Sequence, residues 1–277
     1  MGASEFGFPL LDLLFTVLRN RGTSPLRLRY ETRRAFALGL LWPKCEVLLL
    51  RSKGKNMDVF EALYTTRAMR RVKPDPVPME VQAQILDAAV RGPSGGNTQG
   101  WRFLLVDDRE IMKMLAPLYQ DCVEKLWTTI YAKRYQAALA DPEVPSSITM
   151  KKMVSSVQWA ADNFENIPLL LFGFTRGDPT GGSIWPALWS AQLAARAHGV
   201  GSAPTSVLSF FHSEETFDVL GIPKDQNWVM ATMITMGYPT GTWGVAQRRP
   251  AQEVSYRNQW GNDVGFEINE PLWPGNK

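Results

Sequence analysis

The sequence has very few of the side chains that bind metals or act as nucleophiles. It holds two cysteines, Cys45 and Cys122, which lie far apart and form no CxxC or metal-ligand spacing. It also holds two histidines, His198 and His212, and no HExxH motif. We therefore expect no metal site and no disulfide framework, and we assign neither histidine a catalytic role. The scarcity of cysteine fits a reducing, cytoplasmic compartment.

An uninterrupted apolar run of about 20 residues, which a membrane span needs, is also missing. The most apolar stretches lie within residues 1–56, where Asp12 interrupts the first and Pro43, Lys44 and Glu46 interrupt the second. We expect no stable membrane insertion.

Excess positive charge is confined to one part of the chain. The net charge is +3, yet residues 1–56 alone hold ten Lys and Arg against four Asp and Glu. The remaining sequence is slightly acidic and gives no electrostatic reason to expect nucleic-acid binding. We treat 1–56 as a leader separate from the body, and the preferred interpretation is an upstream translation, an alternative start or an added remnant. Membrane-surface attachment and a genuine structural extension stay open as alternatives.

From Met57 onward the patterning becomes regular and predicts one α+β domain over residues 57–277. Helical patterns cover residues 57–66, 79–91, 108–119, 119–163, 183–199 and 213–221, with Asp107 or Asp108 and Ser213 as N-caps. Strand patterns cover 101–108, 167–174 and 227–239. Because many helices accompany few strands without strict alternation, we expect helices around a small central sheet.

Arginines cluster at two distant places in the body. Arg67, Arg70 and Arg71 follow the first helix, and Arg248 and Arg249 lie near the end of the chain. A guanidinium group suits a phosphate because it is planar, permanently charged and able to donate two parallel hydrogen bonds. The alternative is a solvated basic surface, or cations placed favourably at a helix C-terminus.

Two glycine-rich segments offer polar groups without matching a known phosphate loop. The stretch GPSGGNTQGWRF, residues 92–103, combines Ser94, Asn97 and Gln99 with glycines that allow close backbone approach. It contains neither GK[ST] nor GxGxxG, and a simple helix-to-strand turn is the alternative. We interpret HGVGSAPTSV, residues 198–207, as a second loop able to present backbone N–H groups to a ring edge.

Aromatic residues are frequent between residues 119 and 160, and they include Trp127 and Tyr131. They could line a flat hydrophobic pocket or simply pack in the core. No acid–base pair or activated nucleophile stands out. The pattern therefore favours a phosphorylated cofactor that brings its own reactivity, with the protein supplying position and electrostatics.

Taken in order, these segments resemble the FMN-dependent nitroreductase family. The matching pieces are TTRAMRRVKPDPVP, GPSGGNTQGWRFLLVDD, ALWSAQLAARAHGVGSAP, MGYP and RRPAQEV, and they extend over roughly residues 57–260. Pro-Ser followed by Asn-x-Gln-x-Trp is the most specific of them. The resemblance implies a mostly antiparallel central sheet flanked by helices and an intertwined homodimer with two FMN sites, each built from both chains.

The resemblance also assigns residues to the cofactor site. Arg67, Ala68, Met69 and Arg71 are expected against the flavin and its phosphate, with Arg70 as the alternative one position away. Ser94, Gly95 and Asn97 are expected to reach the FMN of the partner subunit, with Gln99 nearby. Pro204, Thr205 and Ser206 are expected along the N5 side of the flavin, and Arg248 or Arg249 at the phosphate. The segment 119–160 is too variable to align with the family, so Trp127 and Tyr131 are expected in the substrate pocket from the aromatic pattern alone.

The activity implied is hydride transfer from NAD(P)H through FMN to a small nitroaromatic or quinone-like acceptor, with ping-pong kinetics. Two departures bear on the details of FMN contact: Ala68 stands where the family often has Ser, and Gly100 where it often has Pro. Four alternatives stay open at this point: a reductive dehalogenase, a flavin-fragmenting enzyme, a flavin-sequestering protein without turnover, and an interaction protein without a cofactor.

Overall fold

We describe residues 57–273 in a computed structural model of the chain; the leader, residues 1–56, lies outside the described residues. The helices are α3 (Val59–Thr65), α4 (Met79–Ala89), α5 (Arg109–Thr128), α6 (Ala132–Ala140), α7 (Pro145–Asp162), α8 (Ile184–Ala197), α9 (Val207–Phe211) and α10 (Ser213–Leu220). The strands are β1 (Trp101–Val106), β2 (Leu169–Thr175), β3 (Gly201–Thr205) and β4 (Val229–Gly237). Short 3₁₀ turns occupy Gly95–Asn97, Phe164–Asn166, Lys224–Gln226 and Ala251–Val254.

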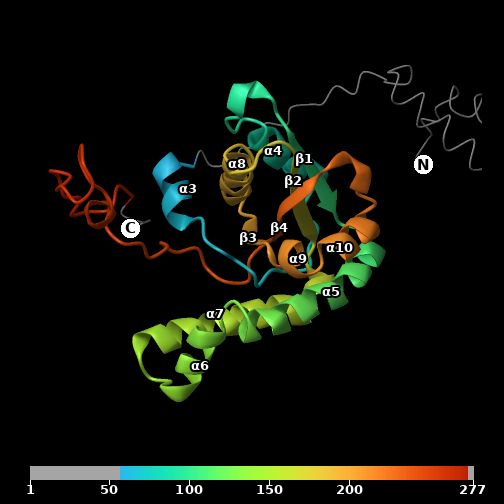
Figure 1. Cartoon of the computed structure of the whole chain (residues 1–277), viewed down its shortest axis with the longest axis horizontal. Coiled ribbons are helices and arrows are strands. Elements are labelled where there is room, and N and C mark those ends of the chain that lie inside the picture. Colours follow the sequence, from blue (N-terminus) through green and yellow to red (C-terminus); the bar gives the residue numbers. More distant parts are fainter. Residues whose placement is uncertain (1–56, 274–277) are drawn as a thin grey trace, which may run out of the picture. The chain divides into compact units, whose positions relative to one another are not determined.

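The four strands form one sheet in the order β1-β2-β4-β3, and every neighbouring pair is antiparallel. Strand β2 is buried along its whole length, as its continuous apolar run predicts. Helices α4 and α8 cover one face of the sheet, and α5, α7 and α9 cover the other (Figure 1). The predicted α+β class, with helices on a mostly antiparallel sheet, is confirmed.

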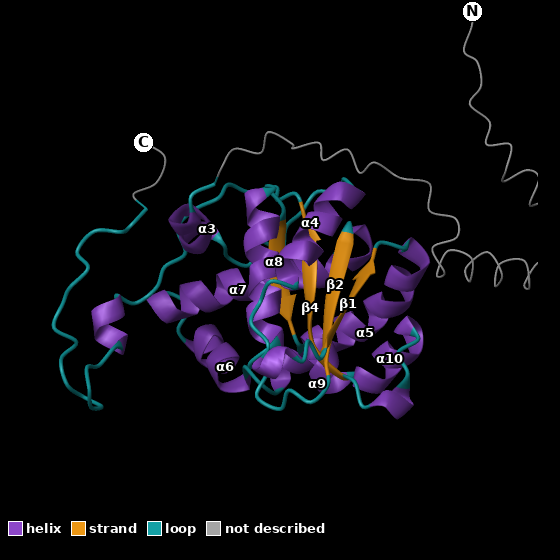
Figure 2. Cartoon of the chain, turned by 90° about the horizontal axis from the view of Figure 1, so that it is seen from above, coloured by secondary structure: helices purple, strands orange, loops and turns teal. Residues whose placement is uncertain are grey.

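The core consists of two clusters separated by the sheet. Side chains alternate across a strand, so Leu170 and Phe172 of β2 pack toward α5 and α7, whereas Leu169 and Leu171 pack toward α4 and α8. Gly173 follows the same alternation on the α8 side, where a Cβ atom would lie 2.9 Å from a methyl group of Leu188, so the glycine leaves room for that side chain. Figure 2 shows β4, β2 and β1 side by side, in the order that they have in the sheet.

The prediction that residues 198–207 form a loop is wrong. Residues Gly201–Thr205 form strand β3, which pairs with β4 in the register Ser202↔Met236 to Thr205↔Met233. The sequence GSAPT has low strand propensity, and Pro204 cannot donate a ladder hydrogen bond, which is tolerated because β3 is an edge strand. Pairing with β4 overrides the local signal. The short helix α9, which follows directly, also falls within a segment without a helical prediction.

Helix ends follow the predicted chemistry closely. Asp108 caps α5 by accepting hydrogen bonds from the amides of Glu110 (2.8 Å) and Ile111 (3.3 Å). Gly221 ends α10 in the left-handed conformation, with φ at 66°. The cap position of α10 is His212, one residue before the predicted Ser213. Within residues 57–273, no helix combines the length and the apolar character that crossing a membrane requires.

Candidate functional site

A cavity of about 240 Å³ opens where the end of β3 meets α5, α7 and α9. Its walls combine one cation, hydroxyl groups and aromatic rings with aliphatic side chains. The lining residues are Arg70, Tyr119, Val123, Leu126, Trp127, Ile130, Tyr131, Met153, Val157, Pro204, Thr205, Ser206, Val207 and Phe210. The cavity thus contains Arg70, both aromatic residues expected in the substrate pocket, and the whole segment 204–206.

Backbone pairing brings the arginine segment to this cavity. The amide of Met69 donates to the carbonyl of Ser202 at 3.0 Å, so residues 68–70 run alongside β3. On the other side, the amide of Thr240 donates to the carbonyl of Arg71 at 3.0 Å. The close approach requires Gly201, where a Cβ atom would lie 2.9 Å from that of Met69. The segment is therefore held by its main chain, independently of what its side chains bind.

Arg70 is the cation of the cavity, and it is half-buried. Burial lowers the pKa of its guanidinium, while the nearby Tyr119 and Tyr131 raise it. No carboxylate within residues 57–273 forms an ion pair with it. A partly desolvated cation without an anionic partner is costly, and an anionic ligand would offset that cost.

Tyr119 lies beside Arg70 and is 2% exposed. Burial raises the pKa of its phenol, whereas Arg70 and a hydrogen bond with Thr205 act in the opposite direction. The hydroxyl group therefore stays protonated at neutral pH and links α5 to the end of β3. The indole N–H of Trp127 is also buried in this wall, and no group in the described part of the chain accepts its hydrogen bond.

The other residues of the first arginine segment point elsewhere. Arg71 donates to the hydroxyl of Ser155 at 2.9 Å and lies 6.0 Å from the ring of Trp159. Arg67 is exposed and donates to the carbonyl of Thr242 at 3.1 Å. Ala68 is exposed and Met69 is buried. Of the three arginines, the alternative Arg70, rather than Arg71, occupies the cavity, because successive side chains of an extended segment point to opposite sides.

The loop of residues 94–99 lies on the opposite face of the sheet. The amide of Gly95 donates to the hydroxyl of Ser183 at the start of α8 (3.3 Å), and that of Gln99 donates to Ser94 (2.8 Å). Asn97 and Gln99 are exposed and have positive φ angles of 55° and 50°. The loop is thus an ordered helix-to-strand connection. It does not line the Arg70 cavity, and its predicted contact with the FMN of a partner subunit stays a prediction.

Arg248 and Arg249 also lie apart from the Arg70 cavity. They line a second, more open cavity of about 620 Å³, which α3, α8 and the C-terminal segment enclose. Its wall includes Thr66, whose buried hydroxyl group has no hydrogen-bond partner among the described residues. The phosphate contact expected from these arginines stays a prediction.

Sequence reasoning counted Tyr119 among the aromatic residues that could line a pocket but gave it no role of its own, and it missed the aliphatic part of the cavity wall. The signal was present in the spacing of α5, where Tyr119, Val123, Leu126 and Trp127 recur every three or four residues. Such a stripe also describes a core face, and these residues do belong to the core. Only the position of Arg70 and β3 shows that the same stripe borders a cavity.

A sequence model of the nitroreductase family matches residues 63–238, which include all four strands and the Arg70 cavity. The chain is 27% identical to NADH dehydrogenase of Thermus thermophilus, over 72% of this chain and 95% of that protein. It is 28% identical to iodotyrosine deiodinase of Nematostella vectensis over a shorter stretch, 30% of each chain. A nitroreductase with bound FMN from Desulfitobacterium hafniense superposes with a TM-score of 0.51 at 18% identity, over 72% of this chain and 98% of that one.

The protein is thus an α+β protein with a pocket suited to an anionic, aromatic ligand. It belongs to the nitroreductase family, and is an oxidoreductase by that membership.

Proposed function

We propose that the protein is an FMN-dependent oxidoreductase that takes hydride from NADH or NADPH and delivers it to a nitroaromatic or quinone-like acceptor. The observation that carries the proposal is the meeting of Arg70 with residues 204–206 and an aromatic wall in one cavity. Two segments far apart in the sequence, both expected against the flavin, lie together there. Bound FMN would supply the redox chemistry, since its ring accepts hydride from a nicotinamide and passes it on.

The residues present fit FMN in charge and shape. Arg70 has no ion-pair partner within the described residues and suits a phosphate or the negative charge of a reduced flavin. Trp127 and Tyr131, whose ring centroids lie 6.0 Å apart, offer flat apolar surface. The described residues of this wall include no carboxylate that would repel an anion.

The chain's own contribution is orientation and exclusion of water. Arg70 would hold negative charge, and residues 204–206 would set the position of the ring edge along β3. Tyr119, neutral because burial raises its pKa, would hold Thr205 in place without adding charge. The aliphatic side chains of α5 and α7 would keep the reacting atoms dry.

We further propose that the working form is a homodimer whose partner completes each site. The Arg70 cavity measures about 240 Å³ in a single chain, below the roughly 300–1,000 Å³ typical of ligand pockets. Residues 94–99 lie on the opposite face of the sheet, where 95–99 are exposed, and do not line the cavity of their own chain. A second copy would bring that loop to it. We place the protein in the cytoplasm, in keeping with the free thiol of Cys122.

The experiment that tests the proposal uses the purified full-length chain. We expect flavin absorbance after gel filtration, bleaching by NADH or NADPH without oxygen, and recovery of the absorbance when menadione is added. Flavin that neither nucleotide bleaches would indicate a sequestering protein without turnover. A preparation that stays colourless and binds no added FMN would overturn the proposal.

A second candidate activity is reductive dehalogenation, which the similarity to iodotyrosine deiodinase favours. The same cavity would then hold a halogenated aromatic ring. Steady-state rates with a nitroaromatic, a halotyrosine and oxygen alone separate the two. A halotyrosine turned over faster than the nitroaromatic would favour the second activity.

A further inference from the structure

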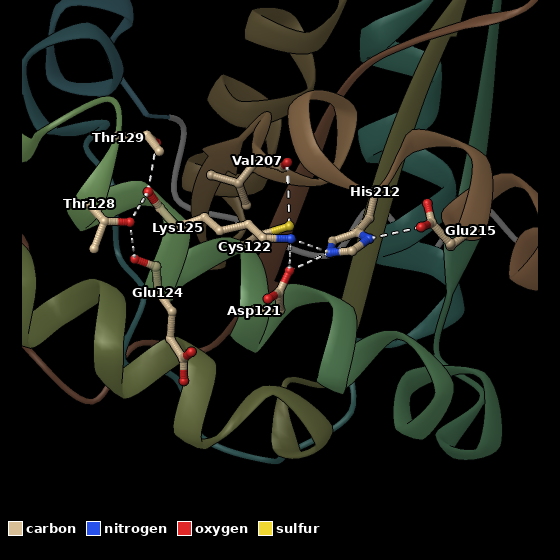
Figure 3. A network of polar contacts seen from close by, with 9 residues as sticks. All are labelled: Asp121, Cys122, Glu124, Lys125, Thr128, Thr129, Val207, His212 and Glu215. Carbon is tan, nitrogen blue, oxygen red and sulfur yellow. Dashed lines mark hydrogen bonds and ion pairs between the residues drawn. The ribbon is translucent and has the colours of Figure 1, made fainter.

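A cluster of charged side chains joins the end of α9 to α5 (Figure 3). His212, the residue after α9, approaches Asp121 of α5 with Nε2 (2.5 Å) and Glu215 of α10 with Nδ1 (3.2 Å). Lys125 of α5 binds the same Asp121 oxygen at 2.5 Å and lies 3.4 Å from His212 Nε2. None of the four residues lines the Arg70 cavity.

Both helices that the cluster joins contribute to the wall of that cavity. Helix α5 contributes Tyr119, Val123 and Trp127, while α9 contributes Val207 and Phe210. Besides packing, one weak hydrogen bond joins the helices in this region, from the buried thiol of Cys122 to the carbonyl of Val207 at 3.5 Å. Helix α9 has only five residues, so it depends on such contacts for its position.

We infer that His212 is a positioning residue: its bond to Asp121 holds α9 against α5 and so sets the width of the cavity that receives the electron acceptor. The inference rests on the proposed function, in which the acceptor is reduced at the flavin held in this cavity and so reaches the same walls. His212 does not touch the acceptor and acts only through the wall residues Val207 and Phe210.

The charges around His212 make this contact sensitive to pH. The groups facing it are Asp121 and Lys125 from α5 and Glu215 from α10, while residues 207–211 of α9 carry no charge. Two carboxylates and one ammonium leave one negative charge in excess, which a proton on His212 balances. The bond to Asp121, assisted by Glu215, raises the pKa of His212 against the opposing effects of burial and Lys125.

The direction of the pH dependence follows from these shifts. Because the folded pKa of His212 is raised, its contribution is complete below about pH 6.5 and is lost as the pH rises through the folded value. The pKa of Asp121 is lowered, and the largest cause is its bond to Lys125. Asp121 therefore keeps its negative charge, and the contact with His212, until the pH falls through that lowered pKa in acid. The contact is therefore strongest in mildly acidic solution and weakens above neutrality.

The test compares Asp121→Asn with Glu110→Gln in the FMN-loaded full chain. Both substitutions remove one carboxylate from α5, but Glu110 pairs only with the exposed Lys113. The acceptor in this test is menadione, which has no titrating group. We expect the wild-type KM to rise about three- to tenfold from pH 6 to pH 8.5, while kcat changes less than about twofold. This change in KM corresponds to a loss near 1 kcal/mol in the free energy of acceptor binding. Asp121→Asn should show the high KM throughout, and Glu110→Gln should follow the wild type.

Hydrogen–deuterium exchange of residues 206–212 supplies a readout that needs no turnover. After correction for intrinsic exchange, wild-type protection should fall between pH 6 and pH 8.5, and that of Asp121→Asn should be low at both. An Asp121→Asn variant with the wild-type pH profile in KM and in exchange would overturn the inference. Loss of thermal stability alone, with an unchanged KM profile, would also overturn it. Absence of menadione reduction with intact exchange results would instead count against the proposed function.

Discussion

The two faces of the sheet treat their predicted binding residues in opposite ways. On the α5 side, Arg70 and residues 204–206 are gathered in one cavity and ordered by main-chain pairing. On the α8 side, the loop of residues 94–99 is ordered, its residues 95–99 are exposed, and it lines no cavity together with Arg70. One chain thus gathers one set of predicted binding residues in a cavity and leaves the other set outside it, which is the arrangement that the proposed dimer would use. A loop that contributes to the site of another copy must be both ordered and exposed.

The largest expected effect comes from removing the cation of the cavity face. We expect Arg70→Met to weaken FMN binding about 10- to 100-fold, because hydrogen bonds to a charged group contribute about 1.5–3 kcal/mol. The matched control is Arg71→Met, which removes a neighbouring cation bound to Ser155 and should change affinity less than about threefold. Flavin fluorescence during titration of the apoprotein gives both constants. Equal losses of FMN affinity in the two variants would contradict the assignment of Arg70, and not Arg71, to the cofactor.

A smaller effect is expected where the exposed loop joins the sheet. A Cβ atom at Gly100 would lie 2.6 Å from the carbonyl oxygen of Arg176, so Gly100→Ala must displace the start of β1. We expect a loss of about 1–3 kcal/mol in the free energy of unfolding, measured by urea denaturation. Gly95→Ala is the control, since nothing lies within 4 Å of the added atom, and it should change stability by less than about 0.5 kcal/mol. Two equal values would show that the loop is not anchored at Gly100.

The smallest effect separates stability from binding within the exposed loop. Gln99 has a φ of 50°, a conformation that costs a residue with a side chain roughly 1 kcal/mol. We expect Gln99→Gly to raise the free energy of unfolding by about 0.5 kcal/mol and to lower FMN affinity. Gln99→Asn should tolerate the same conformation while keeping an amide group. Thermal unfolding and flavin titration measure the two quantities, and unchanged affinity in Gln99→Gly would place this side chain outside the cofactor site.

The sequence predicts the parts of the fold that local chemistry determines. The Asp108 cap, the break at Gly221 and the buried run of β2 are read from neighbouring residues and appear in the structure, whereas the cap of α10 is His212 instead of the predicted Ser213. Strand β3 could not be predicted because its residues favour a turn, and only β4 makes them a strand. The choice between Arg70 and Arg71 could not be made either. It depends on which side of an extended segment faces the cavity, and the pairing of Met69 with Ser202 decides that.

The aromatic residues of α5 and of the start of α6 show the same limit for the site. The sequence leaves two alternatives for Trp127 and Tyr131, a pocket wall or the core. Both residues line the cavity and also pack in or against the core, because the core forms the wall of that cavity. Tyr119 belongs to the same aromatic set, but its spacing is that of any buried helix face, so the sequence gives it no specific role. A sequence pattern indicates that a helix face is buried, but which residues face it across a cavity depends on the fold of the rest of the chain.

The separation of Arg70 from residues 94–99 has a consequence for mass action. If each cofactor is held by Arg70 of one copy and the loop of another, cofactor binding and dimerisation are thermodynamically coupled, so each strengthens the other. Dilution would then release flavin, and added flavin would draw protomers together. The colour of a solution would report its concentration of dimers, and an assay at nanomolar protein would require added FMN where one at micromolar protein would not.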